Sequence, residues 1–484
     1  MVKSSKNNIL IWVNLHQDLY LPIILFMIIG SIYYITLLPG VGYMGDTAKF
    51  QFLGKVLGTP HATGYPNYIL LNHFFVNLFP FGTLAFKANF LSSIFTILSA
   101  FVFYRLLREI SIRPIVSFSV VLTFCFAKTV WNQSLIAEVY TLNLLFTVLV
   151  SYFFVKWHLS KTDRYFYIAC FLYALSFGNH LLMIALLPAI IYIVLITDRK
   201  VFTNPKKIFA VIIFIVIGLS QYLYLYWRTI TPHTAYLETK VYNFQDLIAV
   251  LTGKQFHNSI LAKLSLTQFF QRTWKFTFFF VREMLLFIPL PFISMLITNN
   301  RKIKIFFFLG FLANLIISFS YTIDDVWVYL IPSYFFLNIL LALFIENVFV
   351  KLSQKAIVRW SFLILVIPFL FLTINFHRND MSHDTKDKIF TESVLNYIGS
   401  NGIIINPGYD EFEYLEYYLI GEGLGQRKNI QLMNLEKVEN YLQLNQTGQL
   451  NKIPVYILEY DQADVLQKKG YSPKKIFDNF YLIP

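Results

Sequence analysis

A carboxylate and an imidazole lie close together in the sequence, just after the first long apolar segment. Asp46 stands in Gly45-Asp46-Thr47-Ala48-Lys49-Phe50, and His61 opens the run His61-Ala62-Thr63-Gly64-Tyr65-Pro66. A carboxylate can act as a general base that takes the proton of an attacking hydroxyl, and an imidazole can contact the substrate. Their place in the chain predicts that both side chains lie at the rim of a membrane. A turn or a helix cap also accounts for Asp46, and fixing the turn that follows also accounts for His61.

The composition is that of a multi-pass membrane protein. Of the 484 residues, 56% are hydrophobic and only 14% are charged, too few for the surface of a water-soluble protein. A net charge of +13 can indicate nucleic-acid binding. Here the lysines and arginines form short clusters between apolar runs and no continuous basic stripe, which argues against that partner. Both cysteines lie inside apolar runs, so neither a structural disulfide nor a thiolate metal site is expected.

Apolar segments of roughly 20 residues predict an α-helical bundle with about eleven membrane-spanning helices. The predicted spans are 21–38, 84–107, 114–131, 137–158, 164–178, 180–197, 207–227, 274–298, 303–322, 327–350 and 357–376. Clusters of Lys and Arg occupy alternate loops, as the positive-inside rule requires of cytoplasmic loops. We therefore expect a transmembrane domain over residues 1–376 with a cytoplasmic N-terminus, and residues 377–484 on the far side.

Two external segments, 39–83 and 228–273, are too long to be simple turns. Each contains a short apolar piece, Tyr68–Phe79 and Phe244–Leu251, that is predicted to be a helix lying along the membrane interface. Beyond residue 376 the apolar runs shorten, and strand-like and helix-like runs alternate, which predicts a small α/β domain. The expected strands are 403–405, 430–433 and 455–458, and the expected helices are 384–398 and 461–468.

Polar residues near the predicted spans fall on the side opposite the Lys and Arg clusters. They are Asp46, His61, Glu138, Asn179, His180, Asp324 and Asp325. Ionisable groups at membrane spans are costly and therefore point to function. Structural roles remain open for each: Glu138 suits the first turn of a helix, and Asn179 with His180 suits a tight helical hairpin. Asp324 and Asp325 fit a solvated helix end, or a metal or acceptor contact.

Four Lys and Arg residues fall in or next to segments predicted to be external, contrary to the positive-inside rule. They are Arg228, Lys254, Arg272 and Arg282. A lipid phosphate needs a cationic partner, and arginine can bind it through two hydrogen bonds. Attraction to lipid headgroups is the alternative for all four, and an ion pair with Glu283 is a further alternative for Arg282.

Several ordered motifs resemble those of the protein O-mannosyltransferase-like family. The first loop is similar to the family's G-D-S-x-E-F/L and H-P-P-G-Y-P signature, and Trp131 to Asn143 is similar to W-x-x-x-x-x-x-E-V-Y-x-L-N. The resemblance extends to Gly178-Asn179-His180, to Thr252-Gly253-Lys254-Gln255-Phe256, and to Asp325 within Tyr-x-x-x-Asp ahead of Ile331-Pro332. It departs at Lys49, where an acid is common, and at Ala62-Thr63, which replaces Pro-Pro; the donor or acceptor can therefore differ from the family's usual ones.

The resemblance implies a GT-C type glycosyltransferase in which Asp46 is the catalytic acid of the first external loop. The implied donor is a hexose, such as mannose, on a polyprenyl phosphate, and the implied acceptor is a hydroxyl of a protein or glycan outside the cytoplasm. The expected substrate-binding residues are His61, Tyr65, Glu138, Asn179, His180, Lys254, Arg282 and Asp325. No cofactor is required, because a lipid phosphate is already a good leaving group. The expected location is a bacterial cytoplasmic membrane, or the endoplasmic reticulum membrane of a eukaryote.

Two other functional classes are compatible with the sequence. A transporter or flippase of lipid-linked sugars could use the same charges, although it is expected to carry polar groups at mid-span rather than at one rim. A non-catalytic partner or sensor protein would need only the scaffold and the C-terminal domain.

Overall fold

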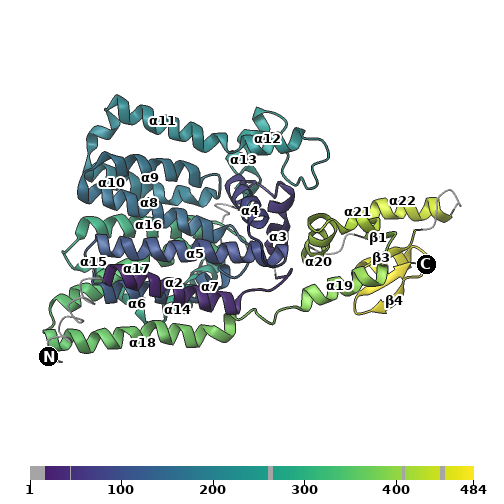
Figure 1. The fold of residues 1–484 in the computed structure, drawn as a ribbon. Helices are drawn as coiled ribbons and strands as arrows, with labels where there is room; N and C mark the ends of the chain where they lie inside the picture. The colour runs from purple at the N-terminus through teal and green to yellow at the C-terminus, as the bar shows by residue number, and fades with distance from the viewer. Residues whose placement is uncertain (1–16, 44, 260–264, 406–408, 447–452, 484) are drawn as a thin grey trace.

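Long apolar helices run side by side through most of the chain (Figure 1). The computed structural model describes residues 17–43, 45–259, 265–405, 409–446 and 453–483. Within these residues, seven helical segments are long and apolar enough to cross a membrane. They are α2 (Gln17–Thr36), α5 (Leu84–Glu109), α8 (Tyr140–Ser160), α11 with α12 (Pro205–Ser220 and Leu223–Ile230), α16 (Arg301–Ser320), η5 with α17 (Val326–Leu330 and Ile331–Val350) and α18 (Gln354–Asn379). The predicted multi-pass architecture is confirmed.

The remaining predicted spans are shorter or broken. Three are short helices at the predicted positions: α6 (Pro114–Cys125), α9 (Asp163–Ser176) and η1 with α10 (Leu181–Leu186 and Leu187–Thr197). The predicted span 274–298 is bent, because α14 (Leu266–Met284) and α15 (Pro289–Leu296) meet at an angle of 72°. The break falls where Leu285 has a φ of 51° and Pro289 lacks a backbone N–H. Counting that bent pair as one span gives eight, so the number eleven is not confirmed.

Helix starts follow local signals in the sequence. The hydroxyl of Thr83 accepts the amide hydrogen of Phe86 at the start of α5, and Ser265 with Gln268 forms a capping box at the start of α14. Pro114 occupies the first position of α6, where its missing N–H costs no hydrogen bond. These signals set the direction in which each helix leaves its loop.

The apolar surface of the bundle is divided between protein and lipid. Helix α17 is buried almost all round at the centre, as expected of a helix that is apolar on every face. Helices α11 and α18 instead expose large apolar side chains, among them Phe209, Val216, Phe362 and Phe369. Such broad apolar exposure fits contact with the hydrocarbon core of a bilayer.

The two long external segments form short helices at one end of the bundle (Figure 1). The first contains α3 (Thr47–Val56) and α4 (Pro66–Leu78), and the second contains α13 (Phe244–Leu251) and η3 (Lys254–Ser259). Both predicted short helices are therefore present, and their position along the membrane interface stays a prediction. The segments are joined by backbone hydrogen bonds, from Thr59 N to Tyr236 O at 3.1 Å and from Glu238 N to Thr59 O at 2.9 Å.

The C-terminal part is a five-stranded mixed sheet with helices. The strands are β1 (Gly402–Ile405), β2 (Ile430–Met433), β3 (Val455–Ile457), β4 (Lys474–Phe477) and β5 (Phe480–Ile483), in the order β2-β1-β3-β5-β4. β1 pairs in parallel with β2 and β3, whereas β5 is antiparallel to β3 and β4. The helices are α19 (Lys386–Ile398), α20 (Tyr409–Glu416), η6 (Tyr417–Gly421), α21 (Leu424–Lys428), α22 (Leu435–Gln446) and α23 (Tyr460–Lys468).

The three predicted strands of this α/β part are confirmed, and the β4–β5 hairpin was not predicted. β4 opens with two exposed lysines and has no apolar run that would identify it. This C-terminal part packs on the end of the bundle that carries the external helices (Figure 1). The Tyr417 hydroxyl accepts from Ala85 N at 3.1 Å, and the Tyr414 hydroxyl donates to Tyr43 O at 3.2 Å. The domain boundary at residue 376 stays a prediction.

Topology can be tested by labelling single cysteines in a chain that lacks Cys125 and Cys170. We expect Phe81→Cys and Ser472→Cys, both at exposed positions, to react with a membrane-impermeant thiol reagent in intact cells. Lys200→Cys, in a Lys/Arg-rich loop at another exposed position, is the control and should react only after the membrane is opened. Labelling of residue 81 from outside, with residue 472 protected, would contradict the predicted common side.

Candidate active site

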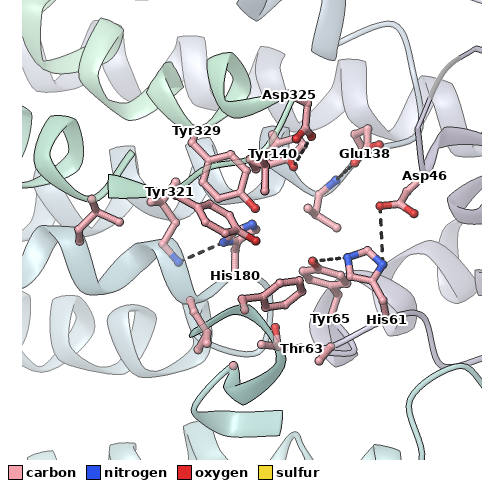
Figure 2. Close-up of a pocket in the computed structure, with 18 of the residues that line it drawn as sticks. Asp46, His61, Thr63, Tyr65, Glu138, Tyr140, His180, Tyr321, Asp325 and Tyr329 are labelled. Atoms are coloured by element: carbon pink, nitrogen blue, oxygen red, sulfur yellow. Dashed lines mark hydrogen bonds and ion pairs between the residues drawn. The ribbon is translucent and has the colours of Figure 1, made fainter. Parts of the chain in front are cut away.

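A polar cavity of about 370 Å³ lies at the end of the bundle that carries the external helices. Its walls come from five regions of sequence that are far apart in the chain. Among the polar and aromatic lining residues, Figure 2 labels Asp46, His61, Thr63, Tyr65, Glu138, Tyr140, His180, Tyr321, Asp325 and Tyr329. Six of the nine predicted site residues are among them, so the predicted convergence of these regions holds for most of the set.

Asp46 reaches the cavity because the backbone turns sharply just before it. Gly45 has a φ of 72°, a conformation that glycine adopts without strain, and α3 begins directly after Asp46. The Asp46 side chain makes no capping hydrogen bond to α3, so the helix-cap alternative does not apply. Its carboxylate instead lies 2.8 Å from Lys49 Nζ and 3.6 Å from His61 Nδ1, with 24% of the side chain exposed. This partial exposure leaves the carboxylate accessible from the cavity.

His61 links Asp46 to the aromatic wall. Its Nδ1 faces Asp46, and its Nε2 lies 2.9 Å from the Tyr65 hydroxyl (Figure 2). Gly64 has a φ of 76°, and a side chain there would collide with Leu225. The close turn at Gly64 therefore sets Tyr65 beside the imidazole, and the three side chains form one chain of polar contacts.

Glu138 lies in the loop before α8 and turns into the cavity. Its carboxylate accepts the amide hydrogen of Val139 at 3.3 Å. Burial raises the pKa of Glu138 well above its ordinary value, and the carboxylates of Asp46 and Asp325 raise it further. Burial therefore favours the protonated form of the Glu138 carboxyl. It stands two residues before the helix, so its side chain is not in the first turn of α8.

His180 presents a buried hydrogen-bond donor to the cavity. Its Nδ1 accepts the amide hydrogen of Leu182 at 3.0 Å, which places the proton of a neutral imidazole on Nε2. Nε2 is buried and has no hydrogen-bond partner among the described residues. The ring lies between those of Tyr65, Tyr140 and Tyr329, with centroid distances of 5.9, 5.7 and 5.3 Å. A buried polar atom left without a partner is a mark of a ligand site.

Asp325 and the tyrosines close the far wall. The Tyr140 hydroxyl donates to Asp325 Oδ2 at 3.5 Å, and the Tyr321 and Tyr329 rings pack at 5.3 Å. None of these three tyrosines was predicted as a site residue. Two of them do stand in motifs of the family resemblance, since Tyr140 follows Glu138 by two residues in E-V-Y and Tyr321 precedes Asp325 by four in Tyr-x-x-x-Asp.

Three predicted binding residues lie outside the cavity lining. Asn179 is buried behind it and donates to the backbone oxygen of Val139 at 3.1 Å, which supports the Glu138 loop. Lys254 is exposed, next to the lining residue Gly253. Arg282 pairs with the buried Glu283 at 3.0 Å, which is the alternative considered for it.

The other external arginines are also engaged in the structure. Arg228 donates to the backbone oxygen of Leu57 at 2.7 Å, and Arg272 donates to that of Phe319 at 2.6 Å. No lysine or arginine lines the cavity within the described residues. The same residues contain no group of three or more His, Cys, Asp and Glu side chains that could hold a metal ion.

Comparison with known proteins places this site in a family context. Residues 46–203 match the model of the Protein O-mannosyl-transferase TMEM260 N-terminal domain. The resemblance to the protein O-mannosyltransferase-like family is confirmed. The matched segment contains Asp46, His61, Tyr65, Glu138 and His180, and therefore most of the polar lining of the cavity.

Two curated relatives carry the same description. Protein O-mannosyl-transferase tmem260 of Dictyostelium discoideum is 26% identical over 227 residues, which are 43% of this chain and 27% of the relative. The mouse (Mus musculus) Protein O-mannosyl-transferase TMEM260 is 30% identical over 128 residues, which are 26% of this chain and 18% of the relative. The chain therefore matches about a quarter or less of the length of these relatives.

Solved structures show how far the fold extends. ArnT from Cupriavidus metallidurans, bound to undecaprenyl phosphate, aligns over 95% of this chain and 97% of its own, with a TM-score of 0.66 at 10% identity. An oligosaccharyltransferase from Archaeoglobus fulgidus aligns over 82% of this chain and 61% of its own, with a TM-score of 0.52 at 14% identity. These likenesses confirm the predicted GT-C type fold.

The free Nε2 of His180 can be tested with a pair of amide variants. In His180→Asn the shorter amide can still accept from Leu182 N, but the Nε2–H donor is lost. We expect transfer of sugar from a lipid-linked donor to fall roughly a hundredfold with an unchanged melting temperature. His180→Gln, which carries an amide near the Nε2 position, should retain more activity. Normal specific activity in the Asn variant would show that His180 acts only as a helix cap.

Proposed function

We propose that this protein is a membrane glycosyltransferase that moves a hexose such as mannose from a polyprenyl phosphate to a hydroxyl acceptor. The acceptor is a protein or a glycan on the non-cytoplasmic side of a bacterial cytoplasmic membrane. The observation that carries the proposal is the Asp46 carboxylate, which projects into a cavity rich in tyrosine and histidine at the end of the bundle. The match of residues 46–203 to the TMEM260 N-terminal domain supports the same reaction class.

The lining of the cavity suits a sugar. Tyrosine rings offer flat surfaces for the apolar faces of a hexose, and their hydroxyls offer hydrogen bonds to its polar edge. His180 Nε2 adds a hydrogen-bond donor at a fixed position, and the buried Glu138 carboxyl adds a second polar group. Such fixed polar groups would orient the sugar so that its anomeric carbon faces Asp46.

An apolar cavity beside the polar one suits a lipid-linked donor. It measures about 480 Å³, lies among α9, α10 and α11, and is lined almost entirely by apolar side chains. Ile184 lines both cavities, so the two adjoin. A prenyl chain could lie in the apolar cavity while its phosphate and sugar occupy the polar one. The ArnT structure with undecaprenyl phosphate provides a related fold that binds a lipid of this class.

The proposed reaction is a direct displacement at the anomeric carbon. Asp46 accepts the proton of the acceptor hydroxyl as its oxygen bonds to the anomeric carbon. The bond from that carbon to the phosphate oxygen breaks, and the lipid phosphate leaves with the electron pair. Among the four external cations considered above, Lys254 is the candidate to steady this phosphate, because Arg228, Arg272 and Arg282 hold backbone or carboxylate oxygens.

A transporter or flippase would need polar groups near the middle of the bundle. The polar lining described here lies instead at the end near the external helices. We therefore favour transfer over transport.

The proposal depends on Asp46, and Asp46→Asn tests it. The variant keeps the size of the side chain but cannot accept a proton at neutral pH. We expect turnover to fall roughly 10²–10⁴-fold, with little change in binding of the lipid-linked donor. Purified protein with radiolabelled polyprenyl-phosphate sugars provides the assay.

Asp324→Asn is the matched control, because Asp324 is exposed and outside the cavity lining; it should behave as the wild type. A base works only when ionised, so wild-type activity should decline as the pH falls through the pKa of Asp46. An Asp46→Asn variant that retains more than about a tenth of the activity would exclude Asp46 as the base, given the loss expected above.

A further inference from the structure

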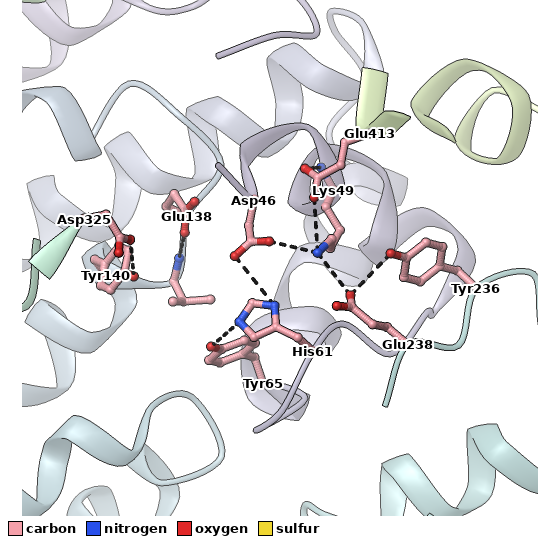
Figure 3. Close-up of polar contacts among 11 residues, drawn as sticks. Asp46, Lys49, His61, Tyr65, Glu138, Tyr140, Tyr236, Glu238, Asp325 and Glu413 are labelled. Atoms are coloured by element: carbon pink, nitrogen blue, oxygen red, sulfur yellow. Dashed lines mark hydrogen bonds and ion pairs between the residues drawn. The ribbon is translucent and has the colours of Figure 1, made fainter. Parts of the chain in front are cut away.

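Lys49 lies on α3, three residues after Asp46, with its side chain turned away from solvent. Only 2% of that side chain is exposed. Its ammonium group contacts three carboxylates, those of Asp46 at 2.8 Å, Glu238 at 3.1 Å and Glu413 at 3.2 Å (Figure 3). A buried lysine with three acidic partners is costly to assemble unless the partners remain in place.

The three carboxylates come from three separate parts of the chain. Asp46 belongs to the first external segment, Glu238 to the second, and Glu413 to α20 of the C-terminal part. Glu413 also accepts the backbone amide hydrogen of Lys49 at 3.3 Å. Helix α3 is therefore attached to α20 through both the backbone and the side chain of one residue.

The charges around Lys49 show how the contacts are balanced. Burial by itself lowers the pKa of Lys49, but Asp46, Glu413 and Glu238 together raise it above its ordinary value, so Lys49 is a cation. Burial raises the pKa of Glu413 to about 8; Lys49 lowers it, and Asp46 raises it. Burial also raises the pKa of the nearby Glu416 to about 8.

The positive charge of Lys49 acts on Asp46, Glu238 and Glu413 together. The Tyr236 hydroxyl donates to Glu238 at 3.3 Å, and His61 contacts Asp46 from the other side. Lys49 therefore lies between Asp46, which lines the cavity, and Glu413 of the C-terminal part (Figure 3).

We propose that Lys49 is a positioning residue that keeps Asp46 anionic and aimed at the cavity, and that Glu413 couples this arrangement to docking of the C-terminal part. The inference rests on the proposed function, because it assigns Asp46 the role of base. Lys49 does not line the cavity and acts through Asp46. Loss of the Glu413 contact would loosen α3 and with it the carboxylate.

Hydrogen–deuterium exchange on the purified full chain tests the coupling without any substrate. We expect Lys49→Met and Glu413→Leu each to raise exchange in both Thr47–Val56 and Tyr409–Glu416, because Lys49→Met removes the ammonium and Glu413→Leu removes both oxygens that contact Lys49. Lys49→Arg should stay close to wild type. The control is Lys55→Met on the same helix, where Lys55 is exposed and its ammonium donates to Asn77 Oδ1 at 2.9 Å. Unchanged exchange in both segments for Lys49→Met and Glu413→Leu would overturn the proposal.

Transfer kinetics test the effect on Asp46. Removing an adjacent cation makes a carboxylate easier to protonate, so the acid limb of the pH–rate profile of Lys49→Met should move up by about one pH unit or more. Turnover at neutral pH should fall about tenfold or more, with a smaller change in KM for the donor. Lys49→Arg should restore most of the rate, and Lys55→Met should match the wild type. A wild-type profile in Lys49→Met would refute the positioning role.

The two experiments separate this inference from the proposed function. If the wild-type protein transfers no sugar, the proposed function fails while the exchange data still decide whether Lys49 couples α3 to α20. If the wild type is active and Lys49→Met has a normal profile, the proposed function stands and Lys49 has no positioning role.

Discussion

The contact between the Asp46 carboxylate and the buried Lys49 ammonium is the interaction on which the site depends. It joins Asp46, which faces the cavity, to Lys49, which faces the rest of the protein. Asp46 Oδ1 and Lys49 Nζ are 2.8 Å apart. A carboxylate at the end of a membrane bundle needs a partner that keeps it charged and directed. Lys49 places a positive charge beside the Asp46 carboxylate, and His61 contacts the same carboxylate. The turn at Gly45 directs the Asp46 side chain toward the cavity.

Hydrophobic content and charge placement predicted the helical architecture, because a bilayer allows few ways to satisfy the backbone. The helix over Phe244–Leu251 was predicted with its observed bounds. The bend between α14 and α15 was not predicted, since it depends on the backbone of Leu285 rather than on average hydropathy. The β4–β5 hairpin was missed because its lysine-rich first strand has no apolar alternation.

The sequence predicted site residues from their charge and from motifs. These predictions agree with the cavity lining where charge and motif are enough to fix where a side chain lies. Asp46, Glu138 and His180 converge because each stands at the same end of its helix or loop. Arg282 was assigned to the substrate but pairs with Glu283, since the choice between two partners depends on side-chain geometry. Glu413 was not considered at all, because nothing in the sequence shows that α20 packs against α3.

The contact between Lys49 and Glu413 also orders events during synthesis of the chain. The two residues are 364 positions apart, so Asp46, Lys49 and the helices around the cavity are made long before Glu413 emerges. Contacts of such long range form late, after the intervening segments have folded. In a partly synthesised chain, the residues around the cavity are therefore present before the contact between Lys49 and Glu413 can form. The site is completed only when the C-terminal part has docked, which confines the finished arrangement to fully assembled molecules.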